Sequence, residues 1–146
     1  MSFVLWLHVA AAILLLGPLT VASMATPRAI RQGAEGLPLL RWLHRTTRIY
    51  GIASILVFLL GLAVVPLTDH VTFDDGWLSA SMGMFLVAWL IVLVVVADQR
   101  RALREVEEGG DAAVRAGRLA ALSGIVALLW LAVLALMVFQ PGGSGS

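Results

Sequence analysis

The chain of 146 residues is 60% hydrophobic and only 13% charged, with a mean hydropathy of +0.96 and a formal net charge of +1. This balance lies far outside that of soluble domains and predicts an integral membrane protein. The absence of cysteine excludes disulfides, iron–sulfur clusters and thiolate metal sites.

Four apolar runs are long enough to cross a bilayer, whose core of about 30 Å needs roughly 20 residues per helix. They cover residues 3–25, 50–67, 78–97 and 119–139, and none contains Asp, Glu or Arg. The predicted fold is all-α: a polytopic membrane protein with an antiparallel four-helix bundle, in a single domain over residues 1–140. Residues 141–146 are rich in Gly and Ser and predict a flexible tail or an appended linker.

The first run holds a histidine, His8, about 8 Å below the membrane surface at 1.5 Å per residue. One interpretation makes His8 a ligand for a metal or haem, or a proton-handling group. The other makes it a neutral imidazole bonded to a carbonyl or a serine across the bundle. Further along, Gly17-Pro18 predicts a bend, because proline removes a backbone donor. A secretory signal is excluded, since no basic residue precedes Arg28 and the run is too long.

Between the first two runs, residues 27–38 carry two prolines and two glycines and predict a cytoplasmic loop. Residues 39–48 are then expected to start a helix at the membrane surface, with Trp42 at headgroup level. His44 lies there among three arginines, which favours a surface histidine in a basic patch that binds lipid headgroups. His8 and His44 fall at opposite faces of the membrane, so they cannot be the two axial ligands of one haem.

The loop after the second run, residues 68–77, contains Asp69, His70 and two further aspartates but no arginine. Because imidazole and carboxylate bind zinc or copper, His8, Asp69 and His70 form a candidate metal site on the outer side. Thioethers prefer Cu(I), and three methionines fall in the outer half of the bilayer: Met82, Met84 and Met137. The alternative is an ordinary acidic loop above methionines that serve only to pack the helices.

Trp89 and Trp130 lie near the middle of the third and fourth runs, away from the interfaces where tryptophan usually sits. They either wall a cofactor pocket or fill the bundle with their N–H groups bonded to neighbours. Asp98 ends the third run beside Gln99-Arg100-Arg101, where pairing with arginine explains it without a function.

The third helix is predicted to continue into water as far as Gly109-Gly110, supported by Arg101–Glu105 and Arg104–Glu108 pairs four residues apart. Small residues four apart predict close helix packing in lipid, within one chain or between chains. These pairs are Ser79 with Gly83, Gly117 with Ala121, and Ala120 with Gly124.

All ten basic residues are arginines, and they lie in two segments, residues 28–48 and 100–118. The positive-inside rule places both segments in the cytoplasm and both termini outside, an N-out/C-out topology. We therefore expect a multi-pass protein of the bacterial inner (cytoplasmic) membrane. Topology accounts for the positive charge, so no nucleic-acid partner is expected.

LHVAAAILLLGP in the first helix and LHR at the start of the second are the most specific motifs, followed by DQRRALREVEEG and RLAALSGIVALLWLAVLALMVFQP. Together they resemble the DUF2269 family of actinobacterial four-helix membrane proteins over nearly the whole chain. That family is similar to the CopD copper-resistance domain and to the haem-binding HemJ proteins, which also open with a histidine in helix one. The resemblance implies copper or haem b handling through His8, although this sequence has no second intramembrane histidine.

No nucleophile elbow, phosphate loop or carboxylate pair occurs, so the sequence does not support an enzyme. The first functional hypothesis is a small accessory or stabilising subunit of a larger membrane complex, such as a respiratory one. Its partners would be lipid and either other membrane subunits or further copies of the chain. The alternative is a copper- or haem-b-binding bundle that uses His8. Transport is a weaker third hypothesis, because the runs contain no acidic residue or broken-helix pair.

Overall fold

A computed structural model describes residues 3–67 and 74–140, and within these ranges the chain is helical with no strand. Four continuous helical rods are long and apolar enough to cross a membrane. This confirms the predicted all-α bundle. The helices are α1 (Phe3–Ala11), α2 (Gly17–Arg31), α3 (Leu37–Ala53), α4 (Ile55–Val64), α5 (Gly76–Glu107) and α6 (Ala113–Phe139).

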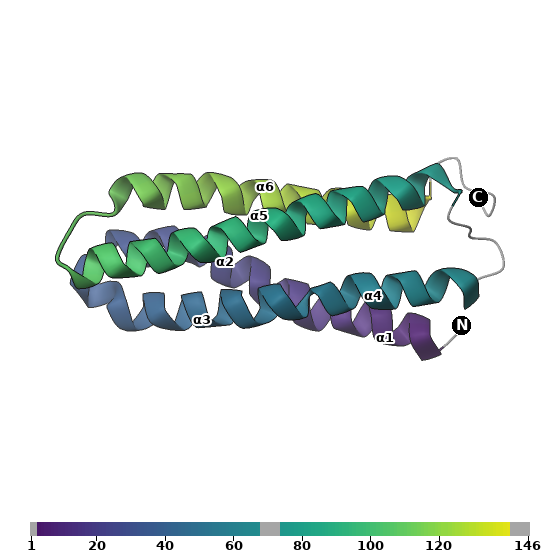
Figure 1. Ribbon diagram of the computed structural model, residues 1–146, viewed down its shortest axis with the longest axis horizontal. Coiled ribbons are helices and arrows are strands. Elements are labelled where there is room, and N and C mark those ends of the chain that lie inside the picture. The colour runs from purple at the N-terminus through teal and green to yellow at the C-terminus, as the bar shows by residue number, and fades with distance from the viewer. Residues whose placement is uncertain (1–2, 68–73, 141–146) are drawn as a thin grey trace.

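The rods run antiparallel, and both arginine-rich connections lie at the same end of the bundle (Figure 1). There α2 packs between α3 and α6, and α3 also contacts α5. At the opposite end α1 packs against α4, and α5 against α6. The positive-inside rule predicts that the arginine-rich end faces the cytoplasm, so we call it the cytoplasmic end and the opposite end the outer end.

The first rod changes partners at a π-helical turn, Ala12–Leu16, directly before Gly17-Pro18. Pro18 has no N–H for the carbonyl four residues earlier, so the regular hydrogen-bond ladder cannot continue there. The Thr20 hydroxyl donates to the Leu16 carbonyl at 2.7 Å and satisfies one acceptor beside the turn. The sequence therefore located this interruption correctly, and the structure shows the form that it takes.

The predicted loop over residues 27–38 is wrong, because α2 continues through Pro27 to Arg31. Proline is tolerated there because the Ser23 carbonyl, which a residue 27 N–H would have bonded, accepts instead from the Ser123 hydroxyl of α6 at 3.0 Å. A 3-10 turn, Gly33–Gly36, then joins α2 to α3. A Cβ at Gly36 would collide with the Ala29 carbonyl, so glycine allows this close approach.

Residues 39–48 are helical, as predicted, and belong to α3, which begins at Leu37 and leads into the second span, with a break at Ser54. The predicted end of the third helix is confirmed. Gly109 has φ +79°, and Gly109 and Gly110 donate to the Val106 and Glu105 carbonyls, which is the Schellman pattern.

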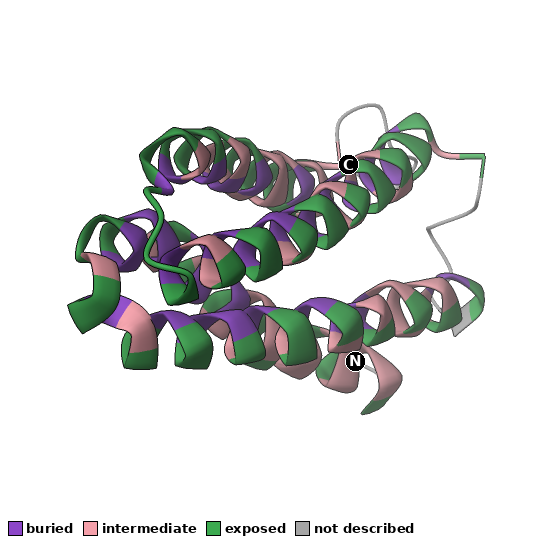
Figure 2. Ribbon diagram, turned by 60° about the vertical axis from the view of Figure 1, so that its left-hand side comes forward, coloured by how far each residue is buried: buried purple, intermediate pink, exposed green. Residues whose placement is uncertain are grey.

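Packing is dense at the cytoplasmic end and sparse at the outer end, as the distribution of buried residues shows (Figure 2). The largest buried cluster, which includes Ala29, Leu40, Ala102 and Leu119, joins α2, α3, α5 and α6. By contrast, α1 contains no fully buried residue. The two helix pairs at the outer end therefore leave space between them, and His8 lies there.

Candidate ligand-binding site

His8 is held by α4 through its ring. Its Nδ1 lies 3.0 Å from the Val57 carbonyl oxygen, and because that oxygen only accepts, Nδ1 carries the hydrogen. A Cβ on Gly61 would lie 3.1 Å from the His8 Cε1 atom, so the absent side chain makes room for the ring. The neutral imidazole therefore keeps the lone pair of Nε2 for another partner. This is the carbonyl-bonded histidine that one sequence interpretation described, with its second nitrogen still available.

The His8 ring lines a cavity of about 590 Å³ at the outer end, enclosed by α1, α4, α5 and α6. We call this the outer cavity. Its volume is in the range of sites that hold drug-sized molecules. Phe58, Phe85 and Trp130 form an aromatic part of its wall, with ring centroids 5.6 Å apart for the first pair and 5.0 Å for the second. Met82 and Met137 line it as well.

Trp77 and Trp130 line the outer cavity, but their indole nitrogens are buried, each with less than 1 Å² of accessible surface and no acceptor in the described part of the chain. Trp77 is only 7% exposed, so water does not readily satisfy its N–H. Buried donors are normally paired, and an unpaired one costs about 1–3 kcal/mol. A ligand in the cavity does not reach these two N–H groups, so the polar contact that we consider is His8 Nε2, which has no hydrogen-bond partner among the described residues.

The outer cavity opens sideways between α1 and α6. Four lining residues are also exposed on the outside of the bundle: Val9 on α1, Ile13 in the π-helical turn, and Leu134 and Val138 on α6. In a membrane these exposed apolar side chains face lipid, so the opening leads into the outer leaflet.

Charge is absent from the lining that the structure describes, apart from the titratable His8 ring. All ten arginines belong to the segments 28–48 and 100–118, which form or adjoin the opposite end of the bundle. A charged ligand inside the cavity would therefore lack a countercharge, and burying an unpaired charge is strongly unfavourable.

The other predicted site residues are placed differently. Asp69 and His70 lie outside the described residues, so their proximity to His8 stays a prediction. Among the residues that are described, no group of three His, Cys, Asp or Glu side chains could hold a metal ion. Met84 packs in the apolar cluster of Val57 and Phe85.

The small residues predicted for packing are on the outside of the bundle. Ser79 and Gly83 on α5 are exposed, and a Cβ on Gly83, Gly117 or Gly124 would meet no atom within 4 Å. Ala120 and Ala121 are exposed too. The contacts between helices of this chain are made by other residues.

Trp89 and Trp130 differ in which of the two predicted roles they fit, filling the bundle or lining a pocket. The Trp89 indole donates to the Gly51 carbonyl at 2.8 Å, beside the break at Ser54, so this side chain fills the bundle and satisfies a freed acceptor. Trp130 instead lines the outer cavity with its N–H unpaired.

His44 is buried at 9% exposure, which corrects its interpretation as a surface residue of a headgroup-binding patch. Its Nδ1 lies 3.2 Å from Gln99 Oε1, and the amide nitrogen of Gln99 donates to the hydroxyls of Thr26 and Thr47 at 2.7 and 3.1 Å. This network joins α2, α3 and α5 at the cytoplasmic end. The sequence analysis assigned no role to Gln99, although a glutamine so close to the end of an apolar run is a signal for a buried hydrogen-bond network.

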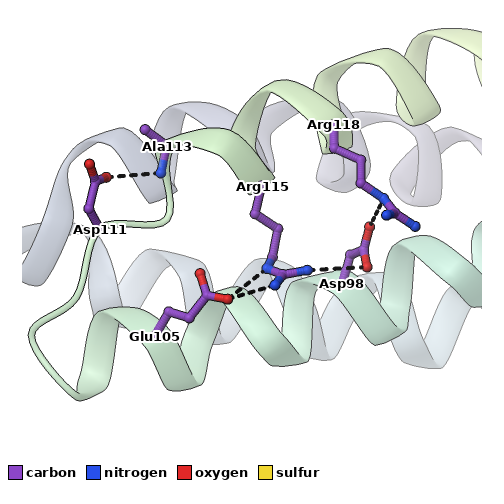
Figure 3. Close-up of polar contacts among 6 residues, drawn as sticks. All are labelled: Asp98, Glu105, Asp111, Ala113, Arg115 and Arg118. Atoms are coloured by element: carbon purple, nitrogen blue, oxygen red, sulfur yellow. Dashed lines mark hydrogen bonds and ion pairs between the residues drawn. The ribbon is translucent and has the colours of Figure 1, made fainter.

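Asp98 pairs with arginine, as expected, but with arginines of α6 rather than with its neighbours in sequence (Figure 3). Its carboxylate is 1% exposed and lies 2.7 Å from Arg118 Nε and 3.6 Å from Arg115 Nη1, in ion-pair contact. Glu105 likewise pairs with Arg115 at 2.7 Å instead of with Arg101. These ion pairs fasten α5 to α6.

Fold and site together define a four-helix integral membrane protein with a lipid-facing cavity at its outer end. The chain belongs to the DUF2269 family, described as predicted integral membrane proteins, whose family model matches residues 2–141. No curated protein and no solved structure matches the sequence.

Proposed function

We propose that this protein binds a small membrane-soluble molecule in the outer cavity, with His8 Nε2 as the polar contact. The observation that carries the proposal is an apolar cavity of about 590 Å³ lined by an imidazole that Val57 orients and whose Nε2 has no hydrogen-bond partner among the described residues. An apolar pocket with a few convergent polar groups is the usual form of a small-molecule site.

Haem b and copper are the ligands that the family resemblance implies, and the cavity suits them only in part. For haem, His8 Nε2 is an acceptable axial ligand, because its Nδ1–H is fixed on a carbonyl as in many metal-binding histidines. The haem carboxylates, however, would find no basic side chain among the described lining residues. A bare copper ion needs several donors around one point, and only His8, Met82 and Met137 of the described lining offer soft or borderline ones. A neutral organic ligand fits the lining better than either.

A substitution at the mouth of the cavity tests the proposal. Leu134→Trp places a large ring at the opening, whereas Leu131→Trp, on the same helix and also exposed, does not line the cavity. After gentle extraction in detergent, native mass spectrometry should show a bound small molecule on the wild type and on Leu131→Trp, and much less on Leu134→Trp. Equal occupancy in all three proteins would contradict the proposal, and a haem absorption band or bound copper would favour the metal-containing alternative.

A second candidate is an accessory subunit of a larger, possibly respiratory, membrane complex in the bacterial inner membrane, formed by one four-helix domain over residues 1–140. It is supported by the small residues of α5 and α6 that face outward, where a neighbouring helix could approach closely. The same native spectra test it, because a stable partner or a second copy of the chain would appear as added mass. A protein that stays a free monomer under all gentle conditions would count against this candidate.

A further inference from the structure

The chemistry of the outer cavity narrows the class of ligand, and this step rests on the proposed function above. No described lining residue carries a fixed charge, so a phosphate or carboxylate held by these residues would be buried unpaired, which is strongly unfavourable. A plain hydrocarbon chain would fill the space but would leave His8 Nε2 without a hydrogen-bond partner. The ligand should therefore be neutral, mostly apolar, and able to form hydrogen bonds.

The direction of those hydrogen bonds is set by the protein. His8 Nδ1 donates to Val57, so Nε2 accepts and requires a donor on the ligand. A hydroxyl group is both donor and acceptor, whereas a carbonyl oxygen only accepts. The cavity therefore matches a hydroxyl better than a carbonyl.

The wall around these groups is aromatic. Phe85 stacks with Phe58 on one side and makes a tilted contact with Trp130 on the other, and all three line the cavity. Aromatic faces pair favourably with a further ring at centroid distances of about 4.5–7 Å. A planar ring is thus better suited to this wall than a saturated one.

We propose that the outer cavity binds the head group of a lipid quinol, the reduced form of a membrane quinone, which enters sideways from the outer leaflet. A quinol is neutral, carries its hydroxyls on an aromatic ring, and dissolves in the membrane through its apolar tail. One of its hydroxyls donates a hydrogen bond to His8 Nε2. The oxidised quinone lacks the hydroxyl hydrogen and leaves His8 without a donor. The proposal concerns binding only.

Equilibrium dialysis of the detergent-solubilised protein tests this preference, with a decyl-chain benzoquinol kept reduced under argon and, separately, its oxidised quinone. We expect the wild type to bind the quinol about tenfold more tightly than the quinone, which is the effect of one hydrogen bond in a buried site. His8→Leu should reduce the ratio to about one, since both forms then meet the same apolar wall. His8→Gln keeps an acceptor near the position of Nε2 and should retain part of the preference.

The controls separate this inference from the proposed function. Leu131→Trp should bind like the wild type, and Leu134→Trp should lose both forms, without a change at any buried position that folding needs. Equal affinity for quinol and quinone in the wild type, or an unchanged ratio in His8→Leu, would overturn the quinol assignment. If the quinol assignment failed in this way but Leu134→Trp still lost a co-purified lipid, the cavity would be a binding site for another class of ligand. If Leu134→Trp changed neither the co-purified lipid nor the binding of quinol and quinone, both proposals would fail.

Discussion

At the scale of the residue, His8 shows how a titratable group can lie within an apolar helix without an unpaired charge. The imidazole is neutral in this arrangement, because one nitrogen donates to a backbone carbonyl of α4 and the other holds a lone pair. Gly61 makes the arrangement possible, since any larger residue there would press on the ring. The histidine and the glycine, 53 positions apart in the chain (61 − 8), thus form one structural unit.

The pair can be tested without changing the histidine. Gly61→Ala puts a Cβ 3.1 Å from His8 Cε1 and should displace the ring, which weakens the bond to Val57. Gly83→Ala, where the added Cβ meets nothing, controls for the higher helix propensity of alanine. Relative to Gly83→Ala, we expect Gly61→Ala to lower the free energy of unfolding by about 1 kcal/mol, the usual net value of a hydrogen bond. Detergent-unfolding titrations measure this, and equal stabilities would contradict the role assigned to Gly61.

At the scale of the element, the helical spans continue past points where a backbone carbonyl loses its usual donor, because another helix supplies a hydrogen bond to that carbonyl. Pro27 leaves the Ser23 carbonyl without its backbone donor, and Ser123 of α6 provides a hydroxyl. At Ser54 the Gly51 carbonyl accepts both from the Ser54 hydroxyl and from the Trp89 indole of α5. In lipid, where water is absent, such donors keep a broken helix within the membrane.

A double-mutant cycle tests the link between Pro27 and Ser123. Ser123→Ala should cost about 0.5–2 kcal/mol of unfolding free energy, because the Ser23 carbonyl loses its donor. In a Pro27→Ala background the new backbone N–H can bond to that carbonyl, so Ser123→Ala should then cost much less. If Ser123 served only to pack against α2, Ser123→Ala would lower the free energy of unfolding by the same amount in both backgrounds.

At the scale of the whole molecule, the two ends of the bundle differ in what holds them. The cytoplasmic end has the largest apolar cluster, the Gln99 network and the ion pairs of Asp98. At the outer end, α1 and α4 form one pair of helices and α5 and α6 another, with the cavity between them. Local opening concentrates where few apolar contacts are buried, so we expect the outer end to move more.

Spin labels measure this difference directly, and the absence of native cysteine makes specific labelling straightforward. Val9→Cys with Val138→Cys reports on the mouth of the cavity, and Arg31→Cys with Val114→Cys reports on the cytoplasmic end. Pulsed electron paramagnetic resonance should give a broader distance distribution for the outer pair, which narrows when ligand binds. Two equally narrow distributions would mean that the outer end is as rigid as the cytoplasmic end.

The sequence by itself determined the number of spans, their antiparallel order, the gathering of arginines at one end, and the interruption at Gly17-Pro18. Each of these follows from local composition, because a run of apolar residues, a cluster of charges or a proline acts over one or two helical turns. Only the tertiary structure decided that α2 continues through Pro27, that His44 is buried against Gln99, and that Asp98 pairs with Arg118 of α6. It also decided that His8 faces a cavity. These features join residues 20 to 100 positions apart, where the partner is set by how helices pack and not by the neighbouring sequence.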